Sequence, residues 1–451
     1  MILYNGVRFP LSFPCPANVR RLDLGCLPMI ESMNANGILL DTAKLSSISS
    51  RLSLESERLD AEIESLVGSR INPESGDQVA RLLFDELGLP PSKLTRKQLR
   101  YSVDDDVLSS LLAHHPVVKL IADHREAQKL KTTYADALPL LVSPDGRIRT
   151  TLKATTARTG RLASENPNCQ NIPIRSEWGM EIRKAFVARP GWKLISCDLS
   201  QIEMRVAAHE SEDPALALVF VDGLDIHTFT AVNLFQLDET GILRLVAGER
   251  AGTLNPADAY RLREFKLRHR LPAKTLGFAV LYGVTASGLQ IQILAAGGPL
   301  IPLDECQRYI DRWFDLYAEV RFWMERQFQH ARLHGMVWDF FGRFRLVPEV
   351  RSALRGVQNE GLRQAGNHPI QSAAQGILKL AMAEVHYEVL PRYGADALPV
   401  LQIHDELLFE AREEIAEDLA QEVKRVMSTV VPLLVPVESS SDVAETWGDL
   451  K

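Results

Sequence analysis

The sequence predicts an α+β fold that is predominantly helical, in which a long helical insertion divides one β domain. Strand-like runs cluster near residues 147–210 and again near 395–445, and helical spacing dominates between the two clusters. A further helical block precedes the first cluster, up to about residue 140. Because pieces of one sheet can lie far apart in the chain, a single split β domain is the simplest account.

Length and composition are those of an ordinary globular protein. The 451 residues exceed what one compact core holds, so about two to four domains or subdomains are expected. No run approaches the ~18 apolar residues of a membrane span, and the N-terminus lacks a secretory pattern. The scattered cysteines lack C-x-x-C spacing and indicate reduced thiols, so we expect a cytoplasmic protein with no membrane partner.

Charge neither identifies nor excludes a nucleic-acid partner. The formal net charge of −7 weighs against a surface that is basic all over, but a local basic groove would suffice. Basic residues outnumber acidic ones along residues 244–274. A solvated helical face is the ordinary explanation of such a run, unless residue spacing argues otherwise.

The N-terminal part is predicted to be an irregular leader followed by helices. Residues 1–27 are rich in proline and aperiodic. The next segment predicts a helix that ends at Gly37 and a short strand after it. Residues 42–67 place apolar side chains on one stripe with charges opposite, which predicts a long amphipathic helix.

Two more helical segments complete this block. Residues 77–87 predict a helix that stops at Gly88, and residues 107–137 predict helices interrupted at 115–116. The loop between them is basic and suited to gripping a nucleic-acid backbone; its cations are Lys93, Arg96, Lys97 and Arg100.

Short strands and a hairpin are predicted around the helical insertion. Residues 147–153, 155–160 and 193–197 predict short strands before the insertion. Helices dominate over 213–336, and residues 337–347 then alternate like a hairpin with a glycine in its turn.

The C-terminal part predicts the second half of the β domain. After a helix over 366–389, apolar runs flank residues 404–406 and predict two strands joined tightly. A helix over 413–427 and a final strand are predicted to end the fold.

An aspartate follows the strand at 193–197. Ser200 and Glu203 match an S-x-x-E capping box, which predicts a helix start just after Asp198. Such boxes are common, so a capped helix with a surface aspartate is an equal alternative when this stretch is taken alone.

A second carboxylate, Asp405, lies at the end of another predicted strand. Hard oxygen ligands of this kind suit Mg²⁺, and two ions ~3.5–4 Å apart can support phosphoryl transfer. A polar hairpin turn is the plain alternative. The apolar residues on both sides favour a buried turn, where an unpaired Asp–Glu sequence would be costly without a cation.

A basic and aromatic helix is predicted between these carboxylates. Arg270, Lys274, Phe278 and Tyr282 follow one another at i+4 spacing and share one face. Cations at one end suit phosphates, and aromatic rings at the other suit a stacked base. Pro272 requires the helix to begin near it.

Six motifs in order make the chain resemble DNA polymerase family A, the DNA polymerase I type, from about residue 27 to the C-terminus. They are Thr159-Gly-Arg161-Leu-Ala-Ser with Pro167-Asn168-Cys-Gln170-Asn171-Ile-Pro; Asp198-Leu-Ser-Gln201-Ile-Glu203-Met-Arg205; Asp225-Ile-His227; Arg270-x3-Lys274-x3-Phe278-x3-Tyr282-Gly; Arg363-x3-Asn367-x-Pro369-Ile-Gln371; and His404-Asp405-Glu406.

The resemblance implies a right-hand architecture with an antiparallel-sheet palm, helical fingers and a helical thumb. The expected division is a leader over 1–27, the thumb with the first palm-entry segment over 28–140, palm over 141–212, fingers over 213–357 and palm again over 358–451.

The resemblance also implies the catalytic and nucleotide-binding residues. Asp198, Asp405 and the carbonyl of Leu199 would hold two Mg²⁺ ions, and Glu203 would exclude a ribose 2′-hydroxyl. The remaining nucleotide contacts would be Arg270, Lys274 and His227 to the triphosphate, Gln201 beside it, and Phe278 and Tyr282 around the base pair.

Primer–template DNA and dNTPs are the partners that the resemblance implies. His404 and Glu406 would lie at the primer terminus, among the catalytic residues together with Lys274. The DNA contacts would be Arg161 and Gln371 in the minor groove, supported by Arg363 and Asn367, and also Asn168, Gln170 and Asn171.

The sequence departs from the family pattern at several places. Leu199 replaces the usual Tyr, and Gly277-Phe-Ala replaces Asn-Phe-Gly. Residues 372–376, Ser-Ala-Ala-Gln-Gly, replace Gly-Thr-Ala-Ala-Asp. The segment 236–265 is longer than the family's usual connection. These departures bear on fidelity and rate, while the expected metal and triphosphate ligands are present.

Nothing of the size of an exonuclease domain precedes residue 27 in this sequence. We therefore expect a phage-like, monomeric polymerase without 3′–5′ proofreading, served by a separately encoded exonuclease or helicase–primase. Two alternatives stay open: a single-subunit RNA polymerase, against which Glu203 and Phe278 argue, and a non-catalytic DNA-binding protein on a polymerase fold.

Overall fold

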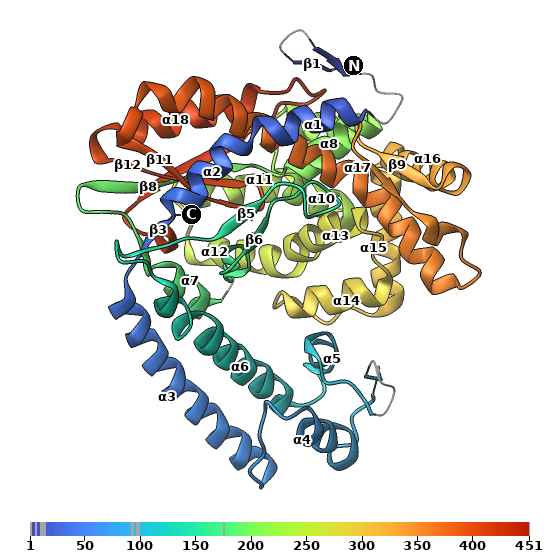
Figure 1. Cartoon of the computed structure of the whole chain (residues 1–451). Coiled ribbons are helices and arrows are strands. Elements are labelled where there is room, and N and C mark those ends of the chain that lie inside the picture. The colour runs from blue at the N-terminus through green and yellow to red at the C-terminus, as the bar shows by residue number, and fades with distance from the viewer. Residues whose placement is uncertain are drawn as a thin grey trace.

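The computed structural model describes residues 2–4, 7–9, 15–91, 94–95, 100–174 and 176–450. A four-stranded sheet and its covering helices form the upper part of the molecule, and a helical lobe extends downward from it (Figure 1). No helix in the described ranges combines the length and apolarity needed to cross a membrane.

The N-terminal segment is partly regular, contrary to the expected leader. Strands β1 (Ile2–Tyr4) and β2 (Val7–Phe9) pair antiparallel, and α1 spans Pro16–Gly25. The prediction of an irregular segment is therefore wrong over α1. A proline in its first turn is compatible with helix entry, and Leu22 is buried in the main core.

The next predictions are confirmed. Helix α2 (Leu27–Asn36) ends at Gly37, and β3 (Ile38–Leu40) follows. Gly37 has φ of 59°, and a Cβ there would lie 2.4 Å from the carbonyl oxygen of Ile148. Only glycine fits this conformation and this close approach.

The lower lobe (residues 42–135) consists mainly of two long helices and shorter ones at their far end (Figure 1). Its long helices, α3 and α6, pack side by side and bury Leu45, Leu52 and Leu130. The predicted break is confirmed, because the His115 ring caps α6 by accepting from Val117 N. The elements are α3 (Thr42–Val67), α4 (Gly76–Ala80), a π-helical segment (Arg81–Glu86), α5 (Asp105–Leu111), α6 (Pro116–Leu130) and a second π-helical segment (Lys131–Ala135). Of the predicted basic loop, Lys93, Arg96 and Lys97 lie outside the described residues.

Short strands join this lobe to the main sheet. β3 lies between β4 and β7, and β5 pairs with β6. The predicted strand at 155–160 is wrong: these residues form bends and a turn that ends at Gly160, with φ of 78°. The segment is polar and has no apolar face to bury against the core. The elements are a 3₁₀ turn (Leu138–Leu141), β4 (Arg147–Ile148), β5 (Thr151–Lys153), β6 (Ala163–Glu165), a 3₁₀ turn (Cys169–Asn171), α7 (Glu177–Arg183) and β7 (Phe186–Val187).

The main sheet unites the two predicted halves of the β domain. Its order is β11-β12-β8-β13, and every neighbouring pair is antiparallel. The strands are β8 (Trp192–Leu199), β11 (Ala397–Ile403), β12 (Glu406–Arg412) and β13 (Ser439–Ala444). Helix α18 (Glu413–Thr429) packs against β8, and α2 packs against β11. A single sheet divided by a helical insertion is therefore confirmed.

The insertion lobe (residues 202–334) is helical, as predicted. Its elements are α8 (Ile202–Ser211), α9 (Pro214–Val221), α10 (Ile226–Phe235), α11 (Glu239–Arg250), α12 (Pro256–Phe265), a π-helical segment (Lys266–Arg270), α13 (Leu271–Leu281), α14 (Ala286–Ala295), α15 (Leu303–Leu316) and α16 (Ala318–His334). Residues 266–270 join α12 directly to α13, so Pro272 lies in the first turn of α13 but not at a free helix start. The wider π-helical turn before it, in which Leu271 N donates to Lys266 O, changes the hydrogen-bond register there.

A hairpin and one long helix return the chain to the sheet. The predicted hairpin is confirmed as β9 (Met336–Trp338) and β10 (Phe344–Leu346). Helix α17 (Arg355–Glu384) is the longest helix of the described chain and is buried over most of its second half. Short helical segments at 348–351, 385–396 and 447–449 complete the fold.

Two buried ion-pair clusters tie distant segments together. Lys379 on α17 is 1% exposed and donates to Asp23 of α1 at 2.6 Å, and Arg343 contacts the same Asp23 oxygen. Glu410 on β12 has no exposed surface and accepts from Arg147 at 2.6 Å and from Arg189 N at 2.8 Å. Charges buried this deeply require such partners.

Candidate active site

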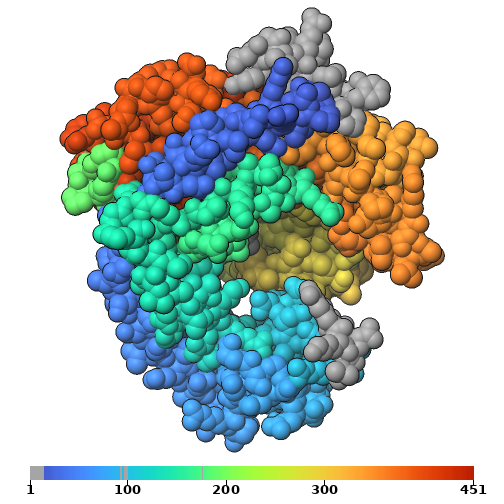
Figure 2. Space-filling view, in the orientation of Figure 1, coloured from blue at the N-terminus to red at the C-terminus, as the bar shows by residue number. Residues whose placement is uncertain are grey.

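A hollow separates the lower lobe from the insertion lobe below the main sheet (Figure 2). Helix α5 at the end of the lower lobe contacts α14 of the insertion lobe beside this hollow. Asp198, near the end of β8, and Asp405, in the turn between β11 and β12, belong to the sheet above it.

The two predicted acidic residues meet at one corner of the main sheet. Asp198 lies at the end of β8 directly opposite Glu406, the first residue of β12. Asp405 occupies the tight turn between β11 and β12, and Leu199 N donates to its carbonyl at 3.2 Å. His404 completes the turn with a φ of 53°. The strand pairing thus brings together side chains more than two hundred residues apart in the chain.

The electrostatics of this corner favour a bound cation. Burial raises the pKa of Asp405 to about 7, with Glu203 and Asp198 adding to the rise and Arg161 opposing it. Burial also raises the pKa of Asp198 and of Glu406, the latter opposed by the Ser196 hydroxyl. Carboxylates gathered in a buried place resist ionisation until a positive charge compensates them. The donor set, hard oxygens only, fits a divalent ion such as Mg²⁺.

The protein side chains do not enclose an ion by themselves. Within the described ranges, no group of three or more His, Cys, Asp or Glu side chains is arranged to hold a metal. An ion at Asp198 and Asp405 would therefore complete its coordination with backbone oxygen, water or substrate, as Mg²⁺ commonly does.

The predicted capping box is wrong. The N-cap of α8 is Gln201, in a left-handed conformation with φ of 55°, and it makes no side-chain cap. The backbone of Ser200 continues the pairing of β8 with the segment before β13, because its N–H donates to Glu438 O at 2.9 Å. The Glu203 carboxylate instead accepts from Arg161 Nη2 at 2.8 Å and from Tyr282 Oη at 2.5 Å.

Four predicted residues thus meet around Glu203. Arg161 comes from the loop before β6, Tyr282 from the end of α13, and Gln371 from α17, where its side chain hydrogen-bonds Tyr282. Burial and the adjacent Glu203 raise the pKa of the Tyr282 hydroxyl, so it stays protonated and donates. His404 lies near the same group, and burial lowers the pKa of its ring, with Arg161 lowering it further.

The predicted triphosphate residues form a second group on α10 and α13. Arg270 contacts both carboxylate oxygens of Asp225, at 2.9 and 3.1 Å, and Asp225 also caps α10. Burial alone would raise the pKa of Asp225, but its bonds with Arg270 and Thr228 lower it to about 2. Burial lowers the pKa of His227 to about 4, aided by Arg270 and Lys274, so its ring is neutral at pH 7.

Phe278 and Lys274 extend this group along the exposed face of α13. The ring of Phe278 is 38% exposed, and its centroid lies 5.4 Å from that of His227. Lys274, also exposed, contributes to the field at His227. The predicted order of cations and then aromatic residues along one helix is confirmed by α13 with the π-helical segment before it.

The predicted DNA contacts are divided between separate places. Asn168, Gln170 and Asn171 lie on one 3₁₀ turn, where Gln170 donates to Gln402 Oε1 at 2.9 Å. Arg363 and Asn367 lie on α17 beside the end of α13. Arg363 pairs with Glu360, and the Asn367 amide faces the carbonyl of Leu281.

One neighbour of the carboxylates was not predicted as a site residue. Gln375 on α17 donates from Nε2 to Asp405 Oδ1 at 2.9 Å and is 1% exposed. Its position four residues after Gln371, on the same helix face, was the signal that could have identified it.

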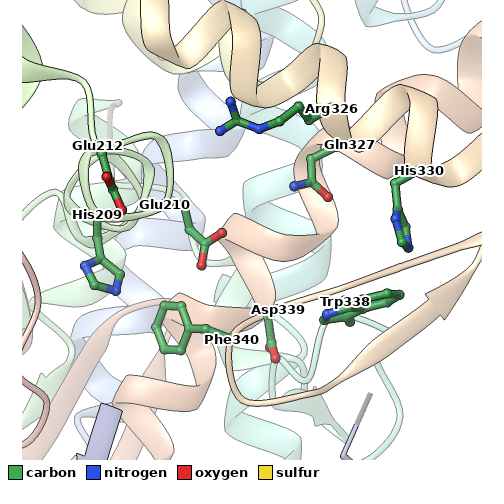
Figure 3. A pocket seen from close by; sticks show the side chains of 9 residues that line it. All are labelled: His209, Glu210, Glu212, Arg326, Gln327, His330, Trp338, Asp339 and Phe340. Atoms are coloured by element: carbon green, nitrogen blue, oxygen red, sulfur yellow. The ribbon is translucent and has the colours of Figure 1, made fainter. Parts of the chain in front are cut away.

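A separate cavity lies at the far end of α8 and contains none of the predicted site residues. Its volume is about 440 Å³, and Glu210, His330 and Asp339 are among the side chains that line it (Figure 3). Burial raises the pKa of Glu210 to about 7 and that of Asp339 to about 6. Asp339 accepts hydrogen bonds from Phe341 N, Arg343 N and the Ser372 hydroxyl, so its role is to fix the hairpin against α17.

Comparison with known proteins agrees with this geometry. The family model described as DNA polymerase family A matches residues 42–245 and 256–449. The gap between the two matches covers residues 246–255, the C-terminal part of α11 and the loop to α12, within the segment that was expected to be longer than usual.

Curated relatives and a solved structure resemble the chain over nearly its whole length. The thermostable DNA polymerase I of Thermus aquaticus is 40% identical over 420 residues, which are 93% of this chain and 47% of that protein. DNA polymerase I of Deinococcus radiodurans is 37% identical over 420 residues, 93% of this chain and 41% of that protein. The chain therefore spans about half the length of these curated relatives.

The solved structure is the POL domain of Pol1 from M. smegmatis in complex with DNA primer-template and dNTP. It superposes with a TM-score of 0.81 at 34% identity and covers 95% of this chain and 70% of that one. This similarity confirms the right-hand polymerase architecture with a sheet-based palm, and members of the family use divalent metal ions. With most of its length matched by the family model, the chain belongs to DNA polymerase family A.

Proposed function

We propose that the chain is a template-directed DNA polymerase that adds dNTPs to a primer 3′ end. The single observation that carries the proposal is the meeting of Asp198 and Asp405 at one corner of the sheet, together with the basic and aromatic face of α13. The solved relative, bound to primer-template and dNTP, supports the same assignment.

Asp198, Asp405 and the carbonyl of Leu199 would hold two Mg²⁺ ions. When bound, such ions activate the attacking hydroxyl and stabilise the leaving oxygen. The raised pKa of Asp405 supports this proposal, because a carboxylate whose charged form is disfavoured by burial and by neighbouring carboxylates is stabilised by a bound cation. Glu406 and His404 flank the turn and would contact the primer terminus.

The group on α10 and α13 would bind the incoming nucleotide. Arg270 and Lys274 would supply positive charge for the triphosphate, and the neutral His227 would donate a hydrogen bond without adding charge. Phe278 and Tyr282 would shape the base-pair pocket, and Gln201 would line it. Arg270 must exchange its Asp225 partner for phosphate oxygens, or share it, when a nucleotide enters.

Glu203 would discriminate against ribonucleotides. Its two partners, Arg161 and Tyr282, fix both carboxylate oxygens. The 2′-hydroxyl of a ribonucleotide would clash with the Glu203 carboxylate, which its two hydrogen bonds keep in place. This clash would favour dNTPs over NTPs. This constraint argues for a DNA polymerase and against the RNA polymerase alternative.

The remaining polar residues would contact DNA. Arg161 and Gln371 would read the minor groove beside the primer end, with Arg363 and Asn367 in support. The turn that carries Asn168, Gln170 and Asn171 would contact the duplex between the sheet and the lower lobe. Since phosphate contacts release counterions, DNA affinity should fall with salt.

We further propose the domain division expected from the sequence. The thumb covers 28–140, the palm 141–212 and 358–451, and the fingers 213–357. The lower lobe then lies within the thumb, and the sheet lies within the palm. The monomeric state, the phage-like origin and the accessory partners stay predictions.

Primer extension on a defined template tests the function. The wild-type chain should extend the primer with dNTPs in Mg²⁺ and much less with NTPs. Asp198→Ala should abolish extension while primer-template binding persists, and Asp222→Ala, at an exposed position on the insertion lobe, serves as the matched control. DNA binding without any extension by the wild-type chain would instead support the non-catalytic alternative.

A further inference from the structure

We propose that Gln375 is a positioning residue for Asp405, which it holds in the orientation that a divalent cation requires. The inference rests on the proposed function of Asp405 as a metal ligand. Its basis is one buried contact: Gln375 is 1% exposed, and its amide nitrogen donates to Asp405 Oδ1 at 2.9 Å.

Among the described residues, this is the one side-chain hydrogen bond that the Asp405 carboxylate accepts. Asp405 lies in a two-residue turn, so its backbone is fixed, but a carboxylate can still rotate about its last bond. A donor on Oδ1 restrains that rotation and leaves Oδ2 available to a cation. Ligands held in advance bind with less reorganisation.

The chemistry of the amide suits this role better than a charged donor would. An arginine or lysine at the same place would also restrain the carboxylate, but its full positive charge would compete with a cation. The amide donates without a net charge. It therefore orients Asp405 and leaves the negative charge available.

The amide oxygen of Gln375 argues against a role for this side chain in packing alone. Gln375 Oε1 is buried and has no hydrogen-bond partner among the described residues. An unpaired buried acceptor is costly, and an apolar side chain of the same size would avoid that cost. The hydrogen bond from the Gln375 amide to Asp405 offsets the cost of burying this unpaired oxygen.

The neighbours of Gln375 fix α17 in the required rotation. A Cβ on Gly376 would lie 2.4 Å from the Phe341 ring, so the helix presses against the hairpin loop there. One turn earlier, Ser372 donates to the buried Asp339 of the same loop. Gln371 and Gln375, at i and i+4, consequently face the site together. Residues 375 and 376 are also where the sequence departs from the usual Ala-Asp.

The test compares Gln375→Met, which keeps the volume and removes the donor, with the wild-type chain. The control is Gln358→Met on the same helix, where the amide donates to Val350 O and not to the site. Two quantities are measured: Mn²⁺ binding to the enzyme with primer-template by electron paramagnetic resonance, and the Mg²⁺ concentration for half-maximal single-nucleotide incorporation.

Gln375→Met should weaken Mn²⁺ binding and raise the half-maximal Mg²⁺ concentration by about 3- to 10-fold, with KM for dNTP at saturating Mg²⁺ unchanged. Gln358→Met should change neither. A variant with wild-type metal dependence would overturn the inference. If Gln375→Met does not fold, Gln375→Ala, the usual family residue, replaces it with the same expectations. Failure of the wild-type chain to extend a primer would instead refute the proposed function.

Discussion

The hydroxyl of Tyr282 donates to the carboxylate of Glu203 at 2.5 Å, which joins the last turn of α13 to the first turn of α8. The other oxygen of Glu203 accepts from Arg161. A residue proposed to exclude ribose and one proposed to shape the base-pair pocket are therefore one hydrogen-bonded unit. The proposed sugar contact and the end of α13 are joined through this unit.

Replacing Glu203 with alanine should relax the choice of sugar. Without the Glu203 carboxylate there is room for a 2′-hydroxyl beside the 2′-carbon of the sugar. The incorporation of NTP relative to dNTP should therefore rise on the order of 10- to 100-fold. The measurement is kcat/KM for one matched dNTP and NTP. Tyr282→Phe, which removes the hydrogen bond but keeps the carboxylate, should retain most of the discrimination. Equal discrimination in Glu203→Ala and wild type would contradict this role.

The metal requirement should depend on pH through Asp405. Its pKa is raised to about 7 in the folded chain, above the ordinary carboxyl value of about 4. The folded state therefore binds the proton more tightly, so this group's contribution to stability is present at low pH and is lost as pH rises from about 4 to 7. A cation that replaces the proton should restore stability above that range.

Thermal unfolding with and without Mg²⁺ at pH 5.5 and pH 8 checks this expectation. The stabilisation by Mg²⁺ should be larger at pH 8, and the Mg²⁺ concentration for half-maximal activity should rise as pH falls below about 7. Asp405→Asn cannot titrate and should show a smaller pH dependence of the Mg²⁺ effect. An identical Mg²⁺ effect at both pH values in the wild-type chain would refute the prediction.

Replacing Arg270 with alanine should weaken nucleotide binding selectively. A charge-assisted contact to phosphate is lost, so KM for dNTP should rise about 10- to 100-fold while primer-template affinity changes little. Arg268→Ala is the matched control, because Arg268 lies on the same helical turn but pairs with Glu264 and is well exposed. Similar KM values for the two variants would show that Arg270 does not bind the triphosphate.

Replacing Glu410 with alanine should destabilise the sheet. Glu410 has no exposed surface, and its removal leaves Arg147 buried beside an empty space. Breaking a buried pair in this way costs about 3–5 kcal/mol. Denaturant unfolding of the variant measures the loss, and Glu414→Ala, on the exposed start of α18, should change stability by less than about 0.5 kcal/mol. A small loss for Glu410→Ala would mean that water reaches Arg147.

Much of the fold could be predicted because local patterns determine it. The stripe of apolar residues in α3 and the apolar runs around the turn at Asp405 each specify one element without reference to the rest of the chain. The proximity of Asp198 and Asp405 could not be predicted from local patterns, since it depends on the pairing of strands far apart in the chain. The family motifs supplied that long-range information.

Tertiary contacts explain what the sequence did not predict. The capping box at Ser200 and Glu203 is locally sound, but the strand pairing of Ser200 and the partners Arg161 and Tyr282 override it. Gln375 resembles any polar helix residue until Asp405 is placed beside it. Helix α1 is joined to the rest of the fold by its Asp23, which pairs with Lys379 and Arg343 far along the chain.

The order of the main sheet has a consequence for how the protein is made. Strand β8, with Asp198, is the inner strand between β12 and β13, and both partners are synthesised more than two hundred residues later. A nascent chain that ends before residue 405 has only one of the two proposed metal ligands, and one that ends before β13 leaves one edge of β8 without a partner strand. The sheet that places Asp198 beside Asp405 is therefore complete only after residue 444 has been synthesised.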